Sequence, residues 1–344
     1  MANTDPNFIV SSLPSYVEQR REPLIRDVVF GASSIAHLSL QTGIKTAAKL
    51  NILTADPVFQ DGSVCGFSPD NTTALTQREI VTGLIKVNES YCPDTLLGKW
   101  AEYLVRIPEP QRAELPFERY IVDVLKEGIR KGIELAIWQG DTTSLDDKLK
   151  WFDGFLKIAG ADGNVVAVNI PAGVSAYEAI KLVILGIPEA DIHSARAKVF
   201  VNPNLFQLFM FELVEKNLYH YAGPQNESPE EYVFPGTSVR VICTYGLTGT
   251  YNIFASCSDN LFYGTDVENA AEQFKIVYDE ISETFLLKVR FNAGVQYAFS
   301  ERVVLGTYTT IDSGQPAYKA LDSIAASAAA LADDDHVFKT KEQA

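Results

Sequence analysis

Apolar residues in the middle of the chain recur at steps of three and four, which is the spacing of one face of a helix. They are Phe117, Ile121, Val124, Leu125, Ile129, Ile133, Ala136 and Ile137. With Gly140 as a stop signal, they predict a helix over Pro116–Gln139, about 35 Å long at about 1.5 Å per residue. Gly128 and Gly132 lie one turn apart beside this stripe, and each costs about 1 kcal/mol of helix propensity. We therefore expect another backbone to approach the helix closely at these glycines.

Two further helices have clear end signals. Ser175 and Glu178 form an S-x-x-E capping box before AYEAIKLVIL, and Gly186 ends that helix. The run AKVFVNPNLFQLF predicts a strand followed by a helix, with Asn202 as the cap and Pro203 in the first turn. A strand that leads directly into a helix indicates α+β or α/β packing rather than a helical bundle.

The last third of the chain alternates apolar and polar residues, as strands do. The run TSVRVICTYGLTGTYNIFAS predicts a hairpin, and two more strand-like runs are EQFKIVYDE and ETFLLKVRFNAGVQYAFSERVVLG. Gly294 interrupts the last of these runs, and we expect a bulge or bend there. After Thr310 the chain becomes rich in alanine and acidic residues, and we expect an exposed helix or disorder.

Residues 44–91 predict a long two-stranded excursion around a tip rich in turn-forming residues, QDGSVCGFSPDNTT. Apolar residues fall on both faces of its arms, so it contributes little to a core of its own. We expect it to lie across a neighbouring subunit; the alternative is a flexible flap. Residues 1–40 have weak periodicity and predict an arm, for which the alternative is a frayed terminus.

Composition and charge narrow the classes of function. The chain has 344 residues, 47% hydrophobic and 21% charged, as in ordinary globular proteins. Because no apolar run approaches the roughly 20 residues that cross a bilayer and no secretory signal is recognisable, we expect a soluble protein made in a cytoplasm. The net charge of −15 argues against a surface that grips nucleic acid, but an acidic inner wall would suit a container for it.

The cysteines and histidines predict neither disulfides nor a metal centre. The cysteines lack metal-ligand spacing and are expected to be reduced, and the histidines lie too far apart in sequence for a paired ligand motif. These residues are Cys65, Cys92, Cys243, Cys257, His37, His193, His220 and His336. Because nucleophile-elbow, dinucleotide and P-loop motifs are also absent from the sequence, we expect no cofactor and no catalytic residues.

One acidic cluster offers an alternative from the class of enzymes. Asp146, Asp147 and Asp153 follow the predicted long helix and could serve acid–base catalysis or bind a cation. We prefer a solvated loop and helix start, because acidic residues favour helix N-termini. Asp162 and Asn164, further along, predict only a turn.

A long helix ending in WQGD, a WFDGFL turn, the run NPNLFQLF and a closing FNAGVQYAF strand follow one another in this order. This order resembles the major capsid proteins of tailed bacteriophages, most closely those of phages of Bacteroidetes and related bacteria, which have the α+β Hong Kong 97-type fold. The resemblance implies six parts. They are an N-terminal arm (1–43), an extended hairpin loop (44–91), a peripheral domain (92–164) with its spine helix (116–139), an axial domain (165–260), strands returning to the peripheral domain (261–310) and a C-terminal tail (311–344).

The resemblance implies a structural protein that assembles through hexamers and pentamers into the icosahedral shell of a virion, around double-stranded DNA and without sequence-specific binding. Assembly would take place in the cytoplasm of the host bacterium, with scaffold, portal and decoration proteins as further partners. No lysine and asparagine pair for a covalent cross-link is recognisable, and we predict none. The alternatives are an encapsulin-like shell around a protein cargo, whose cargo helix would lie near Leu13–Arg21, and a tail or portal component.

Apolar residues of the arm and the loop, for which the sequence suggests no partner in their own chain, are predicted to contact neighbouring subunits. These residues are Phe8, Ile9, Phe30, Val64, Phe67 and Leu75.

Overall fold

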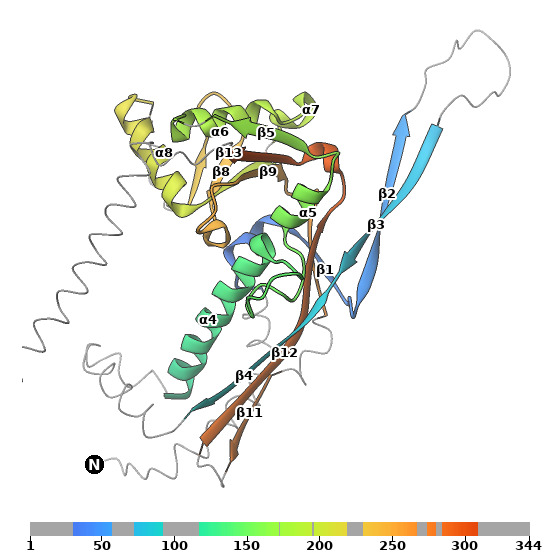
Figure 1. Cartoon of the computed structure of the whole chain (residues 1–344), viewed down its shortest axis with the longest axis vertical. Coiled ribbons are helices and arrows are strands. Elements are labelled where there is room, and N and C mark those ends of the chain that lie inside the picture. The colour runs from blue at the N-terminus through green and yellow to red at the C-terminus, as the bar shows by residue number, and fades with distance from the viewer. Residues whose placement is uncertain are drawn as a thin grey trace, which may run out of the picture.

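The computed structural model describes residues 30–56, 72–91, 117–171, 173–194, 196–218, 230–266, 274–279 and 284–308. Their strands form a six-stranded sheet, a five-stranded sheet and a separate two-stranded sheet, with helices packed beside them. In Figure 1 the six-stranded sheet and its helices lie at the top, and the long strands of the five-stranded sheet run downward from them. This mixture of helices and sheets confirms the predicted α+β class.

The six-stranded sheet is buried on both faces. In spatial order its strands are β5 (Val166–Ile170), β13 (Val304–Tyr308), β9 (Ile253–Cys257), β6 (Ala197–Val201), β8 (Arg240–Cys243) and β7 (Glu231–Val233). Helices α6 (Ala176–Leu185) and α8 (Pro203–Glu215) pack on one face, whereas Phe200 and Phe254 contribute to a core on the other. Burial on both faces explains why β6 and β9 are nearly continuous apolar runs rather than alternating ones.

The predicted starts of α6 and α8 are confirmed. The hydroxyl of Ser175 caps α6 by accepting a hydrogen bond from the Glu178 N–H at 3.4 Å. The side chain of Asn202 caps α8 by accepting one from the Leu205 N–H at 2.6 Å. A single turn, α7 (Glu189–Ile192), follows α6.

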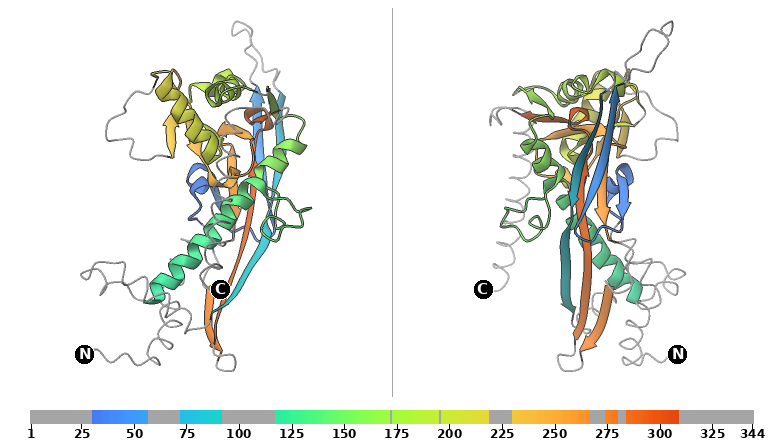
Figure 2. Two further views of the ribbon diagram at one scale, coloured as in Figure 1. Left: turned by 60° about the vertical axis from the view of Figure 1, so that its left-hand side comes forward. Right: turned by 90° about the vertical axis from the view of Figure 1, so that its right-hand side faces the viewer.

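The five-stranded sheet is organised around one long strand. Its members are β1 (Ser39–Thr42), β10 (Leu261–Thr265), β12 (Thr284–Tyr297), β11 (Phe274–Asp279) and β4 (Gly83–Tyr91). The first part of β12 pairs with both β11 and β4, and its last part pairs with β10. Helix α4 (Phe117–Gln139) lies obliquely beside these strands (Figures 1 and 2) and matches the predicted long helix. No helix within the described ranges combines the length and the apolar character that crossing a membrane requires.

The core between the five-stranded sheet and the helices beside it surrounds the C-terminal end of α4. Trp138 is fully buried, and its ring contacts the rings of Phe155, Phe200 and Phe254. Helix α5 (Phe155–Ala161) starts where the chain crosses the end of α4 so closely that a Cβ atom on Gly140 or Gly154 would overlap backbone atoms. The WQGD and WFDGFL motifs are therefore packing motifs, in which glycines permit the crossing and aromatic rings fill the core.

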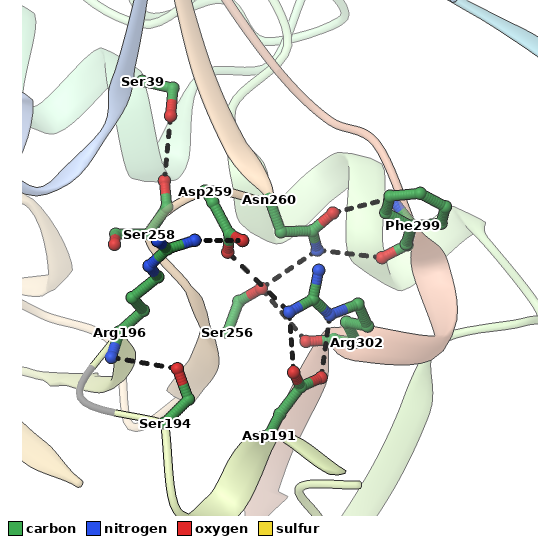
Figure 3. A network of polar contacts seen from close by, with 10 residues as sticks. All are labelled: Ser39, Asp191, Ser194, Arg196, Ser256, Ser258, Asp259, Asn260, Phe299 and Arg302. Carbon is green, nitrogen blue, oxygen red and sulfur yellow. Dashed lines mark hydrogen bonds and ion pairs between the residues drawn. The ribbon is translucent and has the colours of Figure 1, made fainter. Parts of the chain in front are cut away.

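A polar network joins the two large sheets (Figure 3). It surrounds the turn between β9 and β10 and the 3₁₀ helix η4 (Ser300–Arg302), which connects β12 to β13. The buried amide of Asn260 accepts from the Phe299 N–H at 2.7 Å and donates to the Phe299 carbonyl at 2.9 Å. Arg302 donates two hydrogen bonds to the Asp191 carboxylate, at 2.7 and 2.6 Å. These contacts fix one sheet relative to the other.

The two-stranded sheet is a hairpin of β2 (Ala47–Asp56) and β3 (Thr72–Val81), paired in register from Ala47–Val81 to Asp56–Thr72. Although the sequence predicts a two-stranded excursion over 44–91, the pairing ends at Val81, because the next strand, β4, joins β12 in the body. The side chains of Ile85 and Val87 on β4 pack toward the core around α4, which ties β4 to the body rather than to the hairpin.

The predicted hairpin over residues 237–256 is wrong, because β6 lies between β8 and β9 and pairs with both. Local alternation carries no information about such long-range pairing. Strand β13, one of the returning strands (261–310) that the resemblance implies, pairs with β5 and β9 in the six-stranded sheet rather than with β12.

Candidate assembly surfaces

The hairpin leaves the body beside the end of β12, and its strands run upward to the level of the six-stranded sheet (Figures 1 and 2). Its root is packed on the body, where Leu50 and Ile80 are buried together with Ile44 and pack against Phe262 of β10. The root thus has one buried face, which the expectation of a hairpin without one missed, although apolar Val81 is exposed. Beyond the root, β2 and β3 pair only with each other among the described residues.

The hairpin root is fixed to the long strand β12 by close backbone contacts. Asn292 donates to the Lys45 carbonyl at 2.9 Å, and Gln296 donates to the Glu79 carbonyl at 3.1 Å. Between them, Gly294 lies so close to Val81 that a Cβ atom there would overlap its carbonyl oxygen. The register of β12 is unbroken through Gly294, which excludes the bulge, one of the two possibilities that the sequence predicts there, a bulge or a bend. The glycine permits a close backbone crossing.

An ion pair also joins the hairpin root to the body. The Arg78 guanidinium on β3 donates to Asp162 Oδ2 at 2.6 Å and lies over the Tyr297 ring, 4.6 Å from its centroid. The same carboxylate oxygen accepts from the Tyr297 hydroxyl at 3.0 Å and the Ser300 hydroxyl at 2.9 Å. Partial burial alone would raise the pKa of Asp162, but the hydrogen bonds from Arg78, Asn164, Ser300 and Tyr297 hold that pKa well below its ordinary value.

A groove of about 690 Å³ lies between α4 and the outer part of the five-stranded sheet. Apolar side chains of the sheet and of α4 line much of it, and charged side chains belong to the same lining. The lining residues include Ile85, Val87, Tyr91, Phe291, Val124, Ile129, Ile133, Trp151, Lys86, Glu89, Lys131 and Lys148. Apolar grooves with polar residues around them are typical of surfaces that bind another chain.

Gly128 and Gly132 also line this groove. A Cβ atom on either residue would meet nothing within 4 Å. The expectation that another backbone approaches them is therefore wrong for the described part of this chain. Their lack of side chains instead leaves the α4 side of the groove open.

The last part of the predicted arm is anchored on α4. The 3₁₀ helix η1 (Ser33–His37) contributes Ser34, whose N–H donates to Glu134 Oε2 at 3.1 Å and whose hydroxyl donates to Glu134 Oε1. Trp138 Nε1 donates to the same hydroxyl at 2.7 Å. Burial raises the pKa of Glu134, and the hydrogen bonds from Ser34 offset the rise only in part.

Most of the six residues predicted to contact neighbouring subunits lie outside the described residues, namely Phe8, Ile9, Val64 and Phe67. Leu75 lies on β3, with its backbone opposite Leu53. Phe30 is partly buried and packs against the core around α4. The premise that Phe30 lacks a partner in its own chain is therefore wrong, while contacts of all six residues with neighbours stay predictions.

The three carboxylates of the acidic cluster do not converge on one site. Asp153 accepts hydrogen bonds from Thr142 and from Lys157 at 2.7 Å, Asp147 pairs with Lys150, and Asp146 accepts from the Lys148 N–H at 2.9 Å. Within the described residues, no group of three potential metal ligands is close enough to hold an ion. Local structural contacts account for each carboxylate, as expected for a solvated loop.

Comparison with known proteins shows where this arrangement occurs. A chain from the procapsid of satellite phage P4, a particle that includes the size determination (Sid) protein, superposes with a TM-score of 0.58 over 83% of this chain and 89% of its own, at 9% identity. A chain from the capsid of an empty GTA particle gives 0.53 over 81% and 90%, at 12% identity. The chain has the Hong Kong 97-like capsid fold.

A chain from Gordonia phage Cozz superposes similarly, with a TM-score of 0.52 over 81% of this chain and 87% of its own, at 13% identity. No family model matches the sequence, and no curated protein matches it either. At such low identities the structures share the fold and not the surface chemistry. The hairpin, the groove and the contacts at the hairpin root are therefore interpreted from this chain's own residues.

Proposed function

We propose that this chain is the major capsid protein of a tailed phage. In this proposal it assembles through hexamers and pentamers into an icosahedral shell around double-stranded DNA, in the cytoplasm of the host bacterium. The capsid fold supports the proposal because the superpositions cover four fifths or more of this chain and of each compared chain. A net charge of −15 suits a wall that encloses DNA without holding it.

The projecting hairpin is the observation that carries the proposal. A two-stranded ribbon is marginally stable in water by itself, and among the described strands β2 and β3 form hydrogen-bonded pairs only with each other. Such a ribbon gains a second packed face when it lies on another subunit. We infer that the hairpin docks on a neighbour and that the tip residues Val64 and Phe67, with Leu75, contribute apolar contacts there.

The groove beside α4 is the surface that we propose receives the neighbour. Its sheet side consists of β4 and of Phe291 on β12, whereas the hairpin root contacts β12 at Asn292–Gln296. Donor and receiver therefore lie along different parts of β12. Contacts between two different surfaces are heterologous. Subunits joined by such contacts form a closed ring when the rotation from each subunit to the next adds up to a full turn.

The six parts named from the sequence become proposed domains with two adjustments. The extended loop is restricted to the paired hairpin around residues 47–81. Residues 83–91 belong with the five-stranded sheet, which we assign to the peripheral domain. Residues 304–308 belong with the six-stranded sheet, which we assign to the axial domain. The arm (1–43), the spine helix and the C-terminal tail (311–344) keep their proposed bounds, with the last part of the arm, η1 and β1, packed on the body. Scaffold, portal and decoration proteins are proposed partners.

Shortening the hairpin tests the proposal directly. Because Asp56 and Thr72 are paired, residues 57–71 can be replaced by an Asn-Gly turn, which closes a two-residue hairpin loop. We expect a folded protein with an unchanged melting temperature that no longer forms shells, since in this proposal the removed tip serves only to dock on neighbours. A full-length variant with Val64→Ser and Phe67→Ser is the matched control, and we expect it to assemble less well than the wild type. Normal shells from the shortened chain would rule out the role of the hairpin tip.

A further inference from the structure

The direction of the hairpin depends on a small contact region. Each strand of the hairpin has ten residues and spans about 33 Å at about 3.3 Å per residue. By the same length, a rotation of about 10° at the root displaces the far end by about 6 Å. Contacts at the root therefore decide where the tip is presented.

Arg78 contributes an ion pair to that contact region. It lies on β3 with its side chain half-buried, and it reaches Asp162 in the loop after α5. Hydrogen bonds to a carboxylate are stronger than neutral ones, and partial burial of both side chains, 25% and 17% exposed, distinguishes this pair from a solvated surface pair.

Asp162 is held in place by the body independently of Arg78. Its Oδ1 accepts from the Asn164 N–H at 3.1 Å, while Oδ2 accepts from the Tyr297 and Ser300 hydroxyls. The Asp162 carboxylate is thus held in position by contacts within the body that do not involve the hairpin. The Tyr297 ring beneath the guanidinium limits Arg78 to one side of it.

We propose that Arg78 and Asp162 form a latch that presets the direction of the hairpin before another subunit is met. A preset hairpin loses less conformational entropy on docking, so the latch lowers the concentration at which shells form. The consequence for assembly rests on the proposed function. The latch itself is a property of the single subunit and can be measured without any shell.

The test measures the distance between two spin labels by double electron–electron resonance. One label replaces exposed Asn51 on β2 and the other replaces exposed Lys181 on α6, introduced as non-canonical amino acids because the chain has four cysteines. The variants are Arg78→Gln, Asp162→Asn and, as a matched control, Arg196→Gln. Arg196 forms an exposed ion pair with Asp259 at 3.3 Å, in the network between the sheets (Figure 3).

We expect a narrow distance distribution in the wild type and in the control. The two latch variants should broaden it by about twofold, because a neutral amide loses the charge-assisted contact. In Asp162→Asn the amide oxygen keeps the bond to Asn164, and the NH₂ group then faces the donors of Arg78 and Tyr297. Melting temperatures separate this effect from unfolding. A latch variant that melts as a folded protein and keeps the wild-type distribution overturns the proposal.

Shell formation gives the second readout. The latch variants should need about tenfold more protein than the wild type to form shells, as expected when ordering adds about 1.4 kcal/mol to docking. If the wild type forms no shells even with a scaffold protein present, the proposed function fails while the distance measurement still decides the latch. If the distributions broaden but the shell threshold is unchanged, the latch exists and its proposed role in assembly is wrong.

Discussion

Glu134 illustrates how a single buried residue organises this fold. It lies on α4 with 3% of its surface exposed, and its carboxylate binds the N–H and hydroxyl of Ser34 from η1. It therefore anchors the segment between the N-terminal region and β1 on the long helix. Gly246, in the 3₁₀ helix η2 (Tyr245–Leu247), packs on the same turn so closely that a Cβ atom would overlap the Glu134 carbonyl.

Glu134→Ala should lower the free energy of unfolding by about 2 kcal/mol, because it leaves two buried donors of Ser34 without their acceptor. Glu134→Gln keeps one acceptor and should cost less. The folded-state pKa of Glu134 is raised above 4.5. Its contribution therefore favours the folded state increasingly as the pH falls through that raised pKa toward 4.5, and the gain is lost as the pH rises again. Urea unfolding of wild type and Glu134→Gln at pH 7 and pH 5 measures this, and an identical pH dependence in the two proteins would contradict it.

At this scale the sequence predicts what is local and misses what is distant. The caps at Ser175 and Asn202 were predictable because the donor lies three residues away in both cases. Glu134 lies outside the apolar stripe of its helix, and its partner is 100 residues away. Asp162 predicts a turn with Asn164, which forms, but nothing near it in sequence points to Arg78.

At the scale of elements, some glycines lie where two segments of the chain cross closely, and others lie on an open surface. Gly294 on β12 and Gly264, its partner on β10, lie beneath the hairpin root. Gly128 and Gly132 on α4 face the open groove. The sequence marks Gly294, Gly128 and Gly132 as unusual for their elements, but not Gly264. It predicts a bulge or bend at Gly294 and a backbone contact at Gly128 and Gly132, because the identity of the crossing element is not encoded locally.

Gly294→Ala should lower the free energy of unfolding by about 2–4 kcal/mol, because the new methyl group overlaps the Val81 carbonyl and β3 must shift. Gly132→Ala is the matched control, since the same substitution enters open space in a helix and should stabilise the isolated subunit by about 1 kcal/mol. Thermal or urea unfolding of the two variants compares them. Equal effects of the same sign would contradict the crossing at Gly294 as the reason for this glycine.

For the whole molecule, the predictable part was the set of elements and their order. The long helix, the strand-to-helix run, the hairpin and the α+β class follow from periodicity and end signals. The pairing of β13 with β5 and the position of β6 between β8 and β9 do not, because they join residues far apart in the chain. The architecture leaves a ribbon and an apolar groove, both of which are explained most simply by contact with further copies.

The claim that copies of this chain close into a shell is tested most directly by electron microscopy. The full-length protein, expressed alone and with its cognate scaffold, is imaged by negative stain, and its mass is followed by light scattering over a range of concentration and salt. The account predicts rings of five or six subunits and closed shells hundreds of ångströms across. A protein that stays monomeric under all of these conditions, with the scaffold present, would contradict it.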